Sequence, residues 1–146
     1  MIVNALFLSY NKIKGDVTKM YIKSNINPQN KQVGDCVIRA ISTVLNQDWE
    51  TTYIGLAIQG FMMSDMPSSD SVWNEYLKSK GLTRHIVPDS CPNCYTVRQF
   101  ADDHQKGRYL VFVGQHVVAV IDGNYIDTWD SGDRVPIYYW EVNNGV

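Results

Sequence analysis

The sequence lacks the features that mark several large classes of protein. It has no long apolar run, and this excludes a helix that crosses a membrane. Positive charge is not in excess either, since 13 Lys and Arg stand against 15 Asp and Glu, a net charge of −2. Without a basic face, binding to nucleic acid through its phosphates is not expected. We therefore expect neither a membrane nor a nucleic acid as a partner.

Cysteine is sparse as well. The three cysteines, an odd number, argue against a framework of disulfides and favour a reducing compartment. The start of the chain, residues 1–10, is apolar, but it lacks a basic beginning and a small-residue cleavage site, so a signal peptide is not expected. These features predict an intracellular protein located in the cytoplasm.

Length and apolar content are sufficient for one domain. The chain has 146 residues, 45% of them hydrophobic, and a chain of this size buries roughly 68% of the surface that it exposes when unfolded. No internal repeat, low-complexity tract or linker divides it. We assign the domain to residues 27–146. Residues 1–26 form an N-terminal extension or arm, whose role as a pro-region, an added strand or a partner-binding arm stays open.

Helical patterns come first along the chain and strand patterns follow. Apolar spacing and capping residues predict four helices, over 36–45, from 49 to about 60, from 67–69 to 81, and from 96 to 107. Runs of β-branched and aromatic residues predict strands at 84–87, 109–113, 116–121, 125–128 and 137–140. Helices followed by an antiparallel sheet predict the α+β class.

Cys36 stands at the start of the first predicted helix, directly after Gly34 and Asp35. Free backbone N–H groups and the positive end of the helix dipole stabilise a thiolate at such a place. A cysteine nucleophile needs this lowered pKa at neutral pH. A free cysteine on an amphipathic helix is more often a small core residue, so Cys36 alone does not define a function.

A histidine and two aspartates lie on a predicted hairpin. His116 opens one arm, where it can accept the thiol proton, and an acid on the other arm can orient its imidazole. Since side chains alternate across a sheet, a three-residue loop at 122–124 places Asp130 on the face of His116. A two-residue loop places Asp127 and Trp129 there instead. We choose the three-residue loop and Asp130, with Asp127 as the alternative third member.

The order and spacing of these residues resemble those of the papain-like cysteine peptidases. Gly-Asp-Cys36-Val-Ile-Arg-Ala is followed eighty residues later by Gly-Gln-His116-Val-Val-Ala-Val, and then by Asp130 after the hairpin. The resemblance covers roughly residues 27–140. It is best to the compact bacterial and phage members of the family, among them bacteriocin-processing and NlpC-type cell-wall peptidases.

The resemblance implies both a fold and an activity. The fold would be papain-like α+β, with N-terminal helices packed on a C-terminal antiparallel sheet, in a protein of a bacterial cell or a phage-infected host. Cys36 would be the nucleophile, His116 the general base and acid, and Asp130 the orienting group. The chain would attack an amide or isopeptide bond through an acyl-enzyme, with no cofactor and no metal. A protease, a peptidoglycan amidase, a transamidase and a deconjugating enzyme would share this triad, and we slightly prefer a peptide or protein substrate.

The family also suggests where to look for the rest of the cleft. Papain-like enzymes usually carry a Gln several residues before the cysteine, where it donates to the oxyanion. Here Asn30 lies six residues before Cys36, the spacing seen in papain, but it is an asparagine. Gln32 has the expected side chain at a shorter distance from the cysteine. We narrowly prefer Asn30. Trp129 and Trp73 are candidates for the cleft walls, although aromatic residues more often pack in a core. Arg39, on the Cys36 helix, is expected to pair with an acid.

Two other functions stay open. The chain could be a catalytically silent papain-like module that binds a partner, such as a phage protein that engages a host factor. Cys91-Pro-Asn-Cys94 could instead hold zinc or act as a redox pair, but zinc needs two further ligands at a standard spacing, and the sequence offers none. A redox pair needs a place between a strand and a helix, which is loosely present. We prefer a third interpretation, in which Cys91 and Cys94 are two unlinked thiols in a turn.

Overall fold

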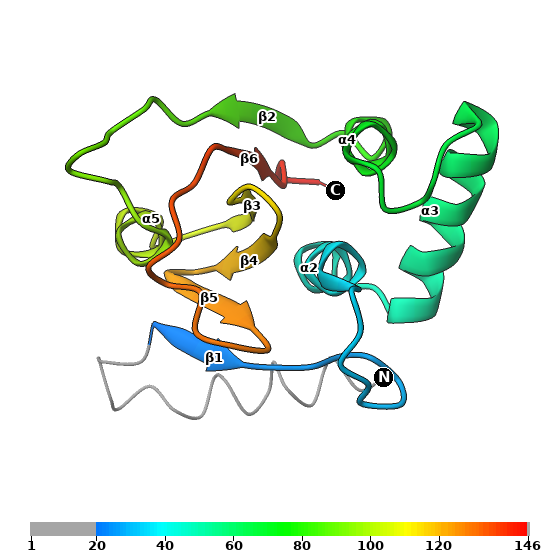
Figure 1. Ribbon diagram of the computed structural model, residues 1–146, viewed down its shortest axis with the longest axis horizontal. Helices are drawn as coiled ribbons and strands as arrows, with labels where there is room; N and C mark the ends of the chain where they lie inside the picture. The colour runs from blue at the N-terminus through cyan, green and yellow to red at the C-terminus, as the bar shows by residue number, and fades with distance from the viewer. Residues whose placement is uncertain (1–19, 146) are drawn as a thin grey trace.

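The structure, a computed structural model, describes residues 20–145 (Figure 1). Within this range the helices are α2 (Cys36–Leu45), α3 (Trp49–Met63), α4 (Asp70–Ser79) and α5 (Val97–Asp103). The strands are β1 (Tyr21–Lys23), β2 (Thr83–Ile86), β3 (Arg108–Phe112), β4 (Val117–Ile121), β5 (Asn124–Asp127) and β6 (Tyr138–Glu141). Among the helices so described, none is long and apolar enough to cross a membrane.

The six strands form one mixed sheet in the order β1-β5-β4-β3-β6-β2. The predicted α+β class is confirmed, but the prediction of a purely antiparallel sheet was wrong, because β1 pairs with β5 in parallel, with Tyr21 beside Tyr125. A strand of three residues is too short to show alternation in the sequence. An added strand was one of the three roles left open for residues 1–26. The remainder of that arm, residues 1–19, lies outside the described residues.

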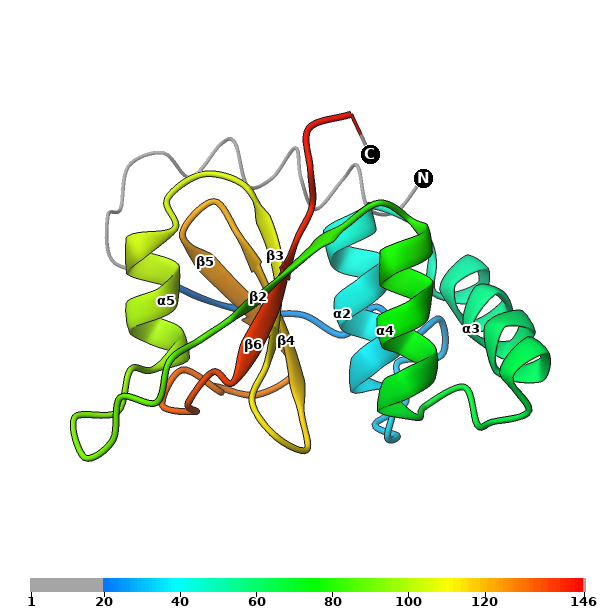
Figure 2. The same ribbon diagram turned by 90° about the horizontal axis from the view of Figure 1, so that it is seen from above.

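Helices cover both faces of the sheet, which accounts for the almost continuous apolar sequence of β4. Helices α2, α3 and α4 lie on one side of the strands and α5 lies on the other (Figure 2). Val117 and Ala119 of β4 pack into the cluster that contains α2, whereas Val118 and Val120 pack into the cluster that contains α5. The alternation of side chains along one central strand therefore joins two cores, and it fixes β4 against α2.

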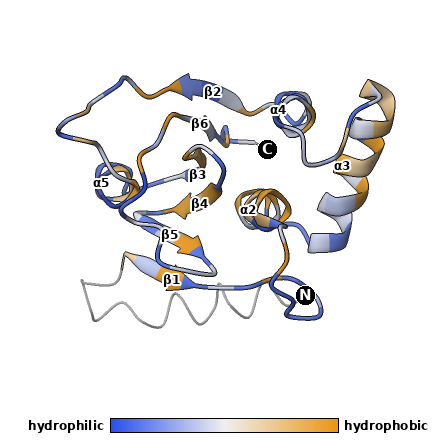
Figure 3. Cartoon of the chain, viewed as in Figure 1, coloured by the Kyte–Doolittle hydropathy of each residue, from blue (hydrophilic) through white to orange (hydrophobic). Residues whose placement is uncertain are grey.

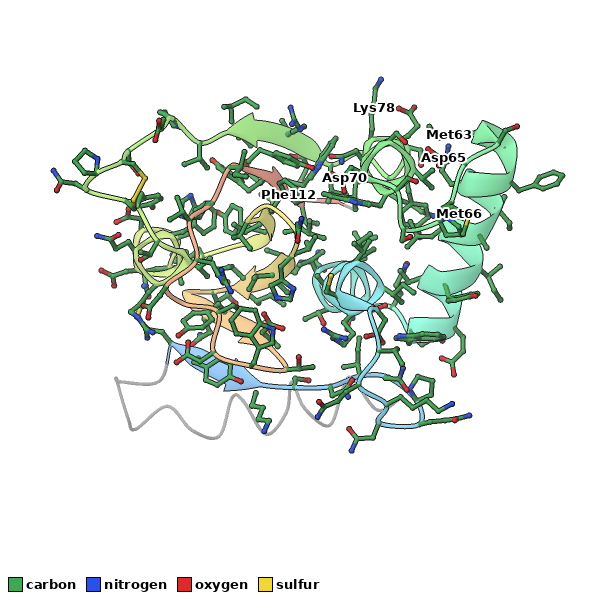
Figure 4. All side chains as sticks on the ribbon, viewed as in Figure 1. Met63, Asp65, Met66, Asp70, Lys78 and Phe112 are labelled. Carbon is green, nitrogen blue, oxygen red and sulfur yellow. A yellow bond between two sulfur atoms is a disulfide. The ribbon has the colours of Figure 1, made fainter. Side chains whose placement is uncertain are left out.

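Trp73 of α4 belongs to the first of these cores. Its side chain has no exposed surface, and its ring lies 5.9 Å from Phe112 and 6.1 Å from Tyr138 between centroids. Its indole N–H donates to Asp70 Oδ1 at 3.0 Å. Figure 4 shows Asp70 and Phe112 together in this region, between α4 and the sheet. The expectation that a tryptophan here more often packs in the core is confirmed for Trp73, and its candidacy as a cleft wall was wrong, since a fully buried ring cannot touch a substrate.

The β4–β5 hairpin turns through two residues rather than three. Ile121 pairs with Asn124, so Asp122 and Gly123 form the turn, with φ values of 46° and 80°. Positive φ at both positions is the type I′ geometry that suits the twist of a hairpin. Gly107 holds Asp122 in place, since its carbonyl accepts from the Asp122 N–H at 2.9 Å and its N–H donates to Asp122 Oδ1 at 2.9 Å. The prediction of a three-residue loop was therefore wrong.

Candidate active site

Three chain segments bring Cys36, His116 and Asp127 together. Cys36 is the first residue of α2, His116 immediately precedes β4, and Asp127 is the last residue of β5. Because β4 and β5 are antiparallel neighbours, the start of one lies beside the end of the other. Helix α2 packs on β4, with its Ala40, Ile41 and Val44 in the same buried cluster as Val117 and Ala119. This packing sets the first turn of α2 against His116.

His116 links the other two side chains. Its Nε2 lies 2.6 Å from Asp127 Oδ2, and its ring is near enough to the Cys36 thiol to lower the pKa of that thiol. Since Nε2 is engaged by the carboxylate, Nδ1 is the ring nitrogen left for the sulfur. The ring of Trp129 lies 5.0 Å from the imidazole between centroids and covers one of its faces. His116 is thus held in one orientation by contacts on two sides.

Asp127 is itself fixed by its neighbours. Ser131 Oγ donates to Asp127 Oδ2 at 2.6 Å, and the Thr128 N–H donates to Oδ1 at 2.8 Å. Ser131 has no exposed surface and Asp127 is also buried. Buried carboxylates need such partners, because desolvation of an unpaired charge is costly. Sequence reasoning missed Ser131; its position four residues after Asp127 carries no motif that could have revealed it.

Asp130, the preferred third member in the sequence interpretation, has other partners. Its Oδ1 accepts from the Tyr125 hydroxyl at 2.6 Å and from the Gly132 N–H at 3.1 Å. The Arg98 guanidinium lies 3.5 Å from the same oxygen, and the Asp130 side chain is half exposed. The two-residue turn is the physical reason, since it places Asp127 and Trp129, and not Asp130, on the side of His116.

Charge in this cluster favours a thiolate paired with an imidazolium. Burial raises the pKa of the Cys36 thiol, but the hydrogen bond and charge of His116, the Val117 N–H and the charge of Arg39 together lower it below its ordinary value. Burial lowers the pKa of His116, but hydrogen bonds and charge from Asp127 and Cys36 raise it to about 9. Proton transfer from sulfur to imidazole is therefore favoured near neutral pH.

A buried aspartate steadies the loop ahead of α2. Asp35 Oδ2 accepts from Asn27 Nδ2 at 3.1 Å and from the Trp49 indole N–H at 2.9 Å, and its Oδ1 forms an ion pair with Arg39. The expected pairing of Arg39 with an acid is thereby confirmed. These contacts hold the guanidinium one helical turn after Cys36, where its charge reaches the thiol. The loop, the helix start and α3 are joined through one carboxylate.

An open groove of about 360 Å³ exposes Cys36 and His116 to solvent. The other residues that line it are Gln32, Val33, Gly34, Arg39, Gln115, Thr128 and Trp129. Of the two predicted oxyanion residues, the structure brings Gln32 to the groove and not Asn30, which lies in a turn with φ of 53° and donates its N–H to the Asn27 carbonyl. Trp129 lines the groove with 41% of its surface exposed, as expected for a cleft wall. Sequence reasoning passed over Gln115, although it directly precedes His116.

The C-x-x-C segment lies in the loop between β2 and α5. Cys91 and Cys94 form a disulfide there, so the expectation of two unlinked thiols was wrong, whereas Cys36 is free. An odd count of three cysteines is compatible with one disulfide and one free thiol, which is the arrangement found here. Among the described residues, no group of three or more His, Cys, Asp or Glu side chains could hold a metal ion.

Comparisons with known proteins add no further support. No protein-family model matches the chain, and neither a curated protein nor a solved structure is significantly similar to it.

Proposed function

We propose that this protein is a papain-like cysteine hydrolase that cleaves an amide bond in a peptide or protein substrate. The observation that carries the proposal is that Cys36 and His116 line one open groove and interact there, while the buried Asp127 holds the far side of the imidazole at 2.6 Å. A cysteine at a helix start, with a histidine and an acid on adjacent strands, is the arrangement of that family. The third member in this proposal is Asp127.

The reaction begins from the thiolate–imidazolium pair. Cys36 Sγ attacks the carbonyl carbon, a C–S bond forms, and the carbonyl electrons move onto oxygen. The intermediate collapses as the C–N bond breaks, and the His116 Nδ1–H gives its proton to the leaving amine. The products of this half-reaction are a free amine, a thioester on Cys36 and a neutral His116.

Water completes the cycle. His116 removes a proton from water as the oxygen attacks the thioester, and the C–S bond then breaks to release a carboxylic acid and regenerate the thiolate. Asp127 holds the imidazole in the required tautomer and stabilises its positive charge, while keeping its own charge. Ser131 and the Thr128 N–H keep the carboxylate aimed at Nε2.

The oxyanion would be stabilised at the beginning of α2. The first N–H groups of a helix have no partners within the helix, and that of Cys36 adjoins the reacting sulfur. Gln32 also lines the groove and carries a side-chain amide that can donate. We assign the donor role to these two groups.

The groove suits an uncharged stretch of polypeptide. Its polar side chains are mainly amides and a hydroxyl, from Gln32, Gln115 and Thr128, and its arginine, Arg39, is already paired with Asp35. Trp129 offers an exposed apolar wall beside the histidine. Backbone amides can bond to such polar groups without the desolvation of an unmatched charge.

Cleavage of a mixed peptide library, followed by mass spectrometry, tests the proposal. Wild type should release new amino termini, and Cys36→Ala should release none. Cys91→Ser is the matched control, because it removes a cysteine that is remote from the groove, and its cleavage pattern should equal that of wild type. The proposal fails if wild type leaves the library intact, or if Cys36→Ala cleaves it equally well.

A further inference from the structure

Exposed apolar residues gather on helix α3 and the loop after it, and none of them lines the groove. Across the described chain, the large hydrophobic residues with the most exposure include seven from α3 and the loop after it: Tyr53 48%, Ile54 57%, Ile58 55%, Phe61 86%, Met62 73%, Met63 38% and Met66 67%. We call these seven residues the α3 patch. Figure 3 shows the hydrophobic colour along α3 at the margin of the molecule. Figure 4 shows Met63 and Met66 at the end of this helix, next to the start of α4.

Helix α3 is apolar on its outer face as well as on its inner face. Leu56 and Gly60 are buried on the side that packs against α2 and α4. Ile54, Ile58 and Phe61 follow one another at steps of four and three residues, so they form a stripe on the opposite side. A helix that is apolar all round is normally enclosed by protein. The outer stripe of α3 is therefore exposed, although its composition is typical of a helix that is enclosed by protein.

The outer face of α3 offers enough apolar area for one side of a small protein interface. Met63 lies nine residues after Ile54, half a turn away on the helix, and Met66 lies beyond the end of the helix, so Ile54, Ile58, Phe61 and Met62 are the patch residues that share the outer face. A large aromatic side chain presents roughly 150–250 Å² and an Ile or Met somewhat less, so these four residues expose on the order of 500 Å². Two such faces bury about 1,000 Å² in total, which is the lower limit of a specific protein interface.

Charge around the α3 patch argues against a lipid surface. The helix contains one charged residue, Glu50, and no Lys or Arg. Asp48 caps its beginning and Asp65 follows its end. Helices that lie on membranes carry basic residues that attract anionic headgroups, whereas these acids would be repelled. The patch is thus suited to an apolar protein surface without strong charge, and its own surface has that character.

We propose that the outer face of α3, formed by Ile54, Ile58, Phe61 and Met62, is the interface of a symmetric homodimer, in which the α3 helices of two copies pack antiparallel. A twofold axis beside Ile58 sets the two Ile58 residues against each other and brings Ile54 of each copy opposite Met62 of the other. The antiparallel order keeps the two Glu50 side chains at opposite ends of the interface, where they do not repel. The flexible Met side chains fill gaps between the helices.

The dimer leaves the groove open. The residues that line the groove come from the loop before α2, from the first turn of α2 and from the ends of β4 and β5, and none comes from α3. The outer stripe of α3 faces away from α2. Dimerisation would therefore proceed whether or not the chain hydrolyses a substrate, and the test of each proposal is independent of the other.

Sedimentation velocity from low to several hundred micromolar protein tests the interface. Wild type should sediment with twice the mass of one chain, and Phe61→Glu should be monomeric. Ile86→Glu is the matched control, because Ile86 is 64% exposed on β2 outside the patch, and this variant should stay dimeric. A wild type that is monomeric throughout, or a Phe61→Glu variant that stays dimeric, overturns the proposal.

Cross-linking tests the same arrangement without adding a charge. In a Cys36→Ala background, Ile58→Cys should form a disulfide-linked dimer rapidly upon mild oxidation, because the two cysteines lie near the axis. Glu50→Cys should not form one, because antiparallel packing places the two residues 50 at opposite ends of the interface. Rapid linking through Glu50→Cys, or none through Ile58→Cys, contradicts the antiparallel dimer.

Discussion

Replacement of Asp127 by Asn probes the part of the site that orients His116. Asp127 accepts three hydrogen bonds, from His116 Nε2 and Ser131 Oγ at Oδ2 and from the Thr128 N–H at Oδ1. An asparagine has nearly the same shape, but one of its two polar atoms donates. Either that donor faces the Thr128 N–H, where two donors meet, or it faces His116 and the imidazole loses its acceptor.

The expected loss follows from one broken charge-assisted hydrogen bond. Such a bond contributes about 1.5–3 kcal/mol, which corresponds to a roughly 10- to 150-fold loss in kcat/KM. The pKa of His116 should fall from about 9 toward its ordinary value of about 6.5, because the carboxylate no longer stabilises the imidazolium. An NMR titration of the His116 ring resonances measures this shift directly.

Asp130→Asn is the matched control, because Asp130 bonds to Tyr125 and Gly132 and not to His116. This variant should keep the His116 pKa and the kcat/KM of wild type. The reasoning is refuted if Asp130→Asn lowers the His116 pKa as far as Asp127→Asn does, or if Asp127→Asn leaves both quantities unchanged.

The proton on His116, the charge of Arg39 and the burial of the two tryptophans can each be tested. Hydrolysis should lose activity as the pH rises through about 9, since His116 with that pKa then lacks the proton for the leaving amine; a kcat/KM profile that stays level beyond pH 10 or so would contradict this. Arg39→Gln should raise the pKa of Cys36, because a positive charge that favours the thiolate is removed; an unchanged pH dependence of thiol alkylation would be the contrary result. Trp73→Ala should cost about 3–5 kcal/mol in the free energy of unfolding, whereas Trp129→Ala, at a position 41% exposed, should cost far less and weaken substrate binding; urea titrations that rank the two the other way would be inconsistent with the fold.

Local pattern was enough to find Cys36 and His116. The helix that begins at Cys36 carries apolar residues at helical spacing, and Ile41 and Val44 are fully buried on the face that meets β4. His116 precedes a run of five buried residues that form the central strand. In both cases the signal lies within the element itself, so a single sequence shows it.

The third member of the site depends on a contact between distant segments. The choice between Asp127 and Asp130 is decided by the hairpin register, which follows from a positive φ at Asp122. Gly107, fifteen residues earlier in the chain, holds Asp122 by two hydrogen bonds. No local rule includes that contact, and an Asp-Gly-Asn sequence is compatible with either loop length.

The different burial of the two tryptophans was only partly visible in the sequence, where the position of Trp129 beside Asp130 made it the better cleft candidate. Trp73 and Trp129 are alike as residues, and both follow polar segments. Trp73 is buried because Phe112 and Tyr138, from strands much later in the chain, close over it. Trp129 stays accessible because it follows β5 at the rim of the groove. Tertiary packing, rather than sequence context, separates a core tryptophan from a cleft wall.

The rate of Cys36 alkylation by iodoacetamide, measured against pH in wild type, His116→Ala and His85→Ala, decides whether His116 activates the thiol. Wild-type Cys36 should react with an apparent pKa well below the roughly 8.5 of a free thiol. His116→Ala should restore the ordinary value, whereas His85→Ala, which alters a histidine on β2 paired with Glu141, should not. If wild type and His116→Ala share one apparent pKa, or if Cys36 does not react at all, Cys36 and His116 do not form an activated pair.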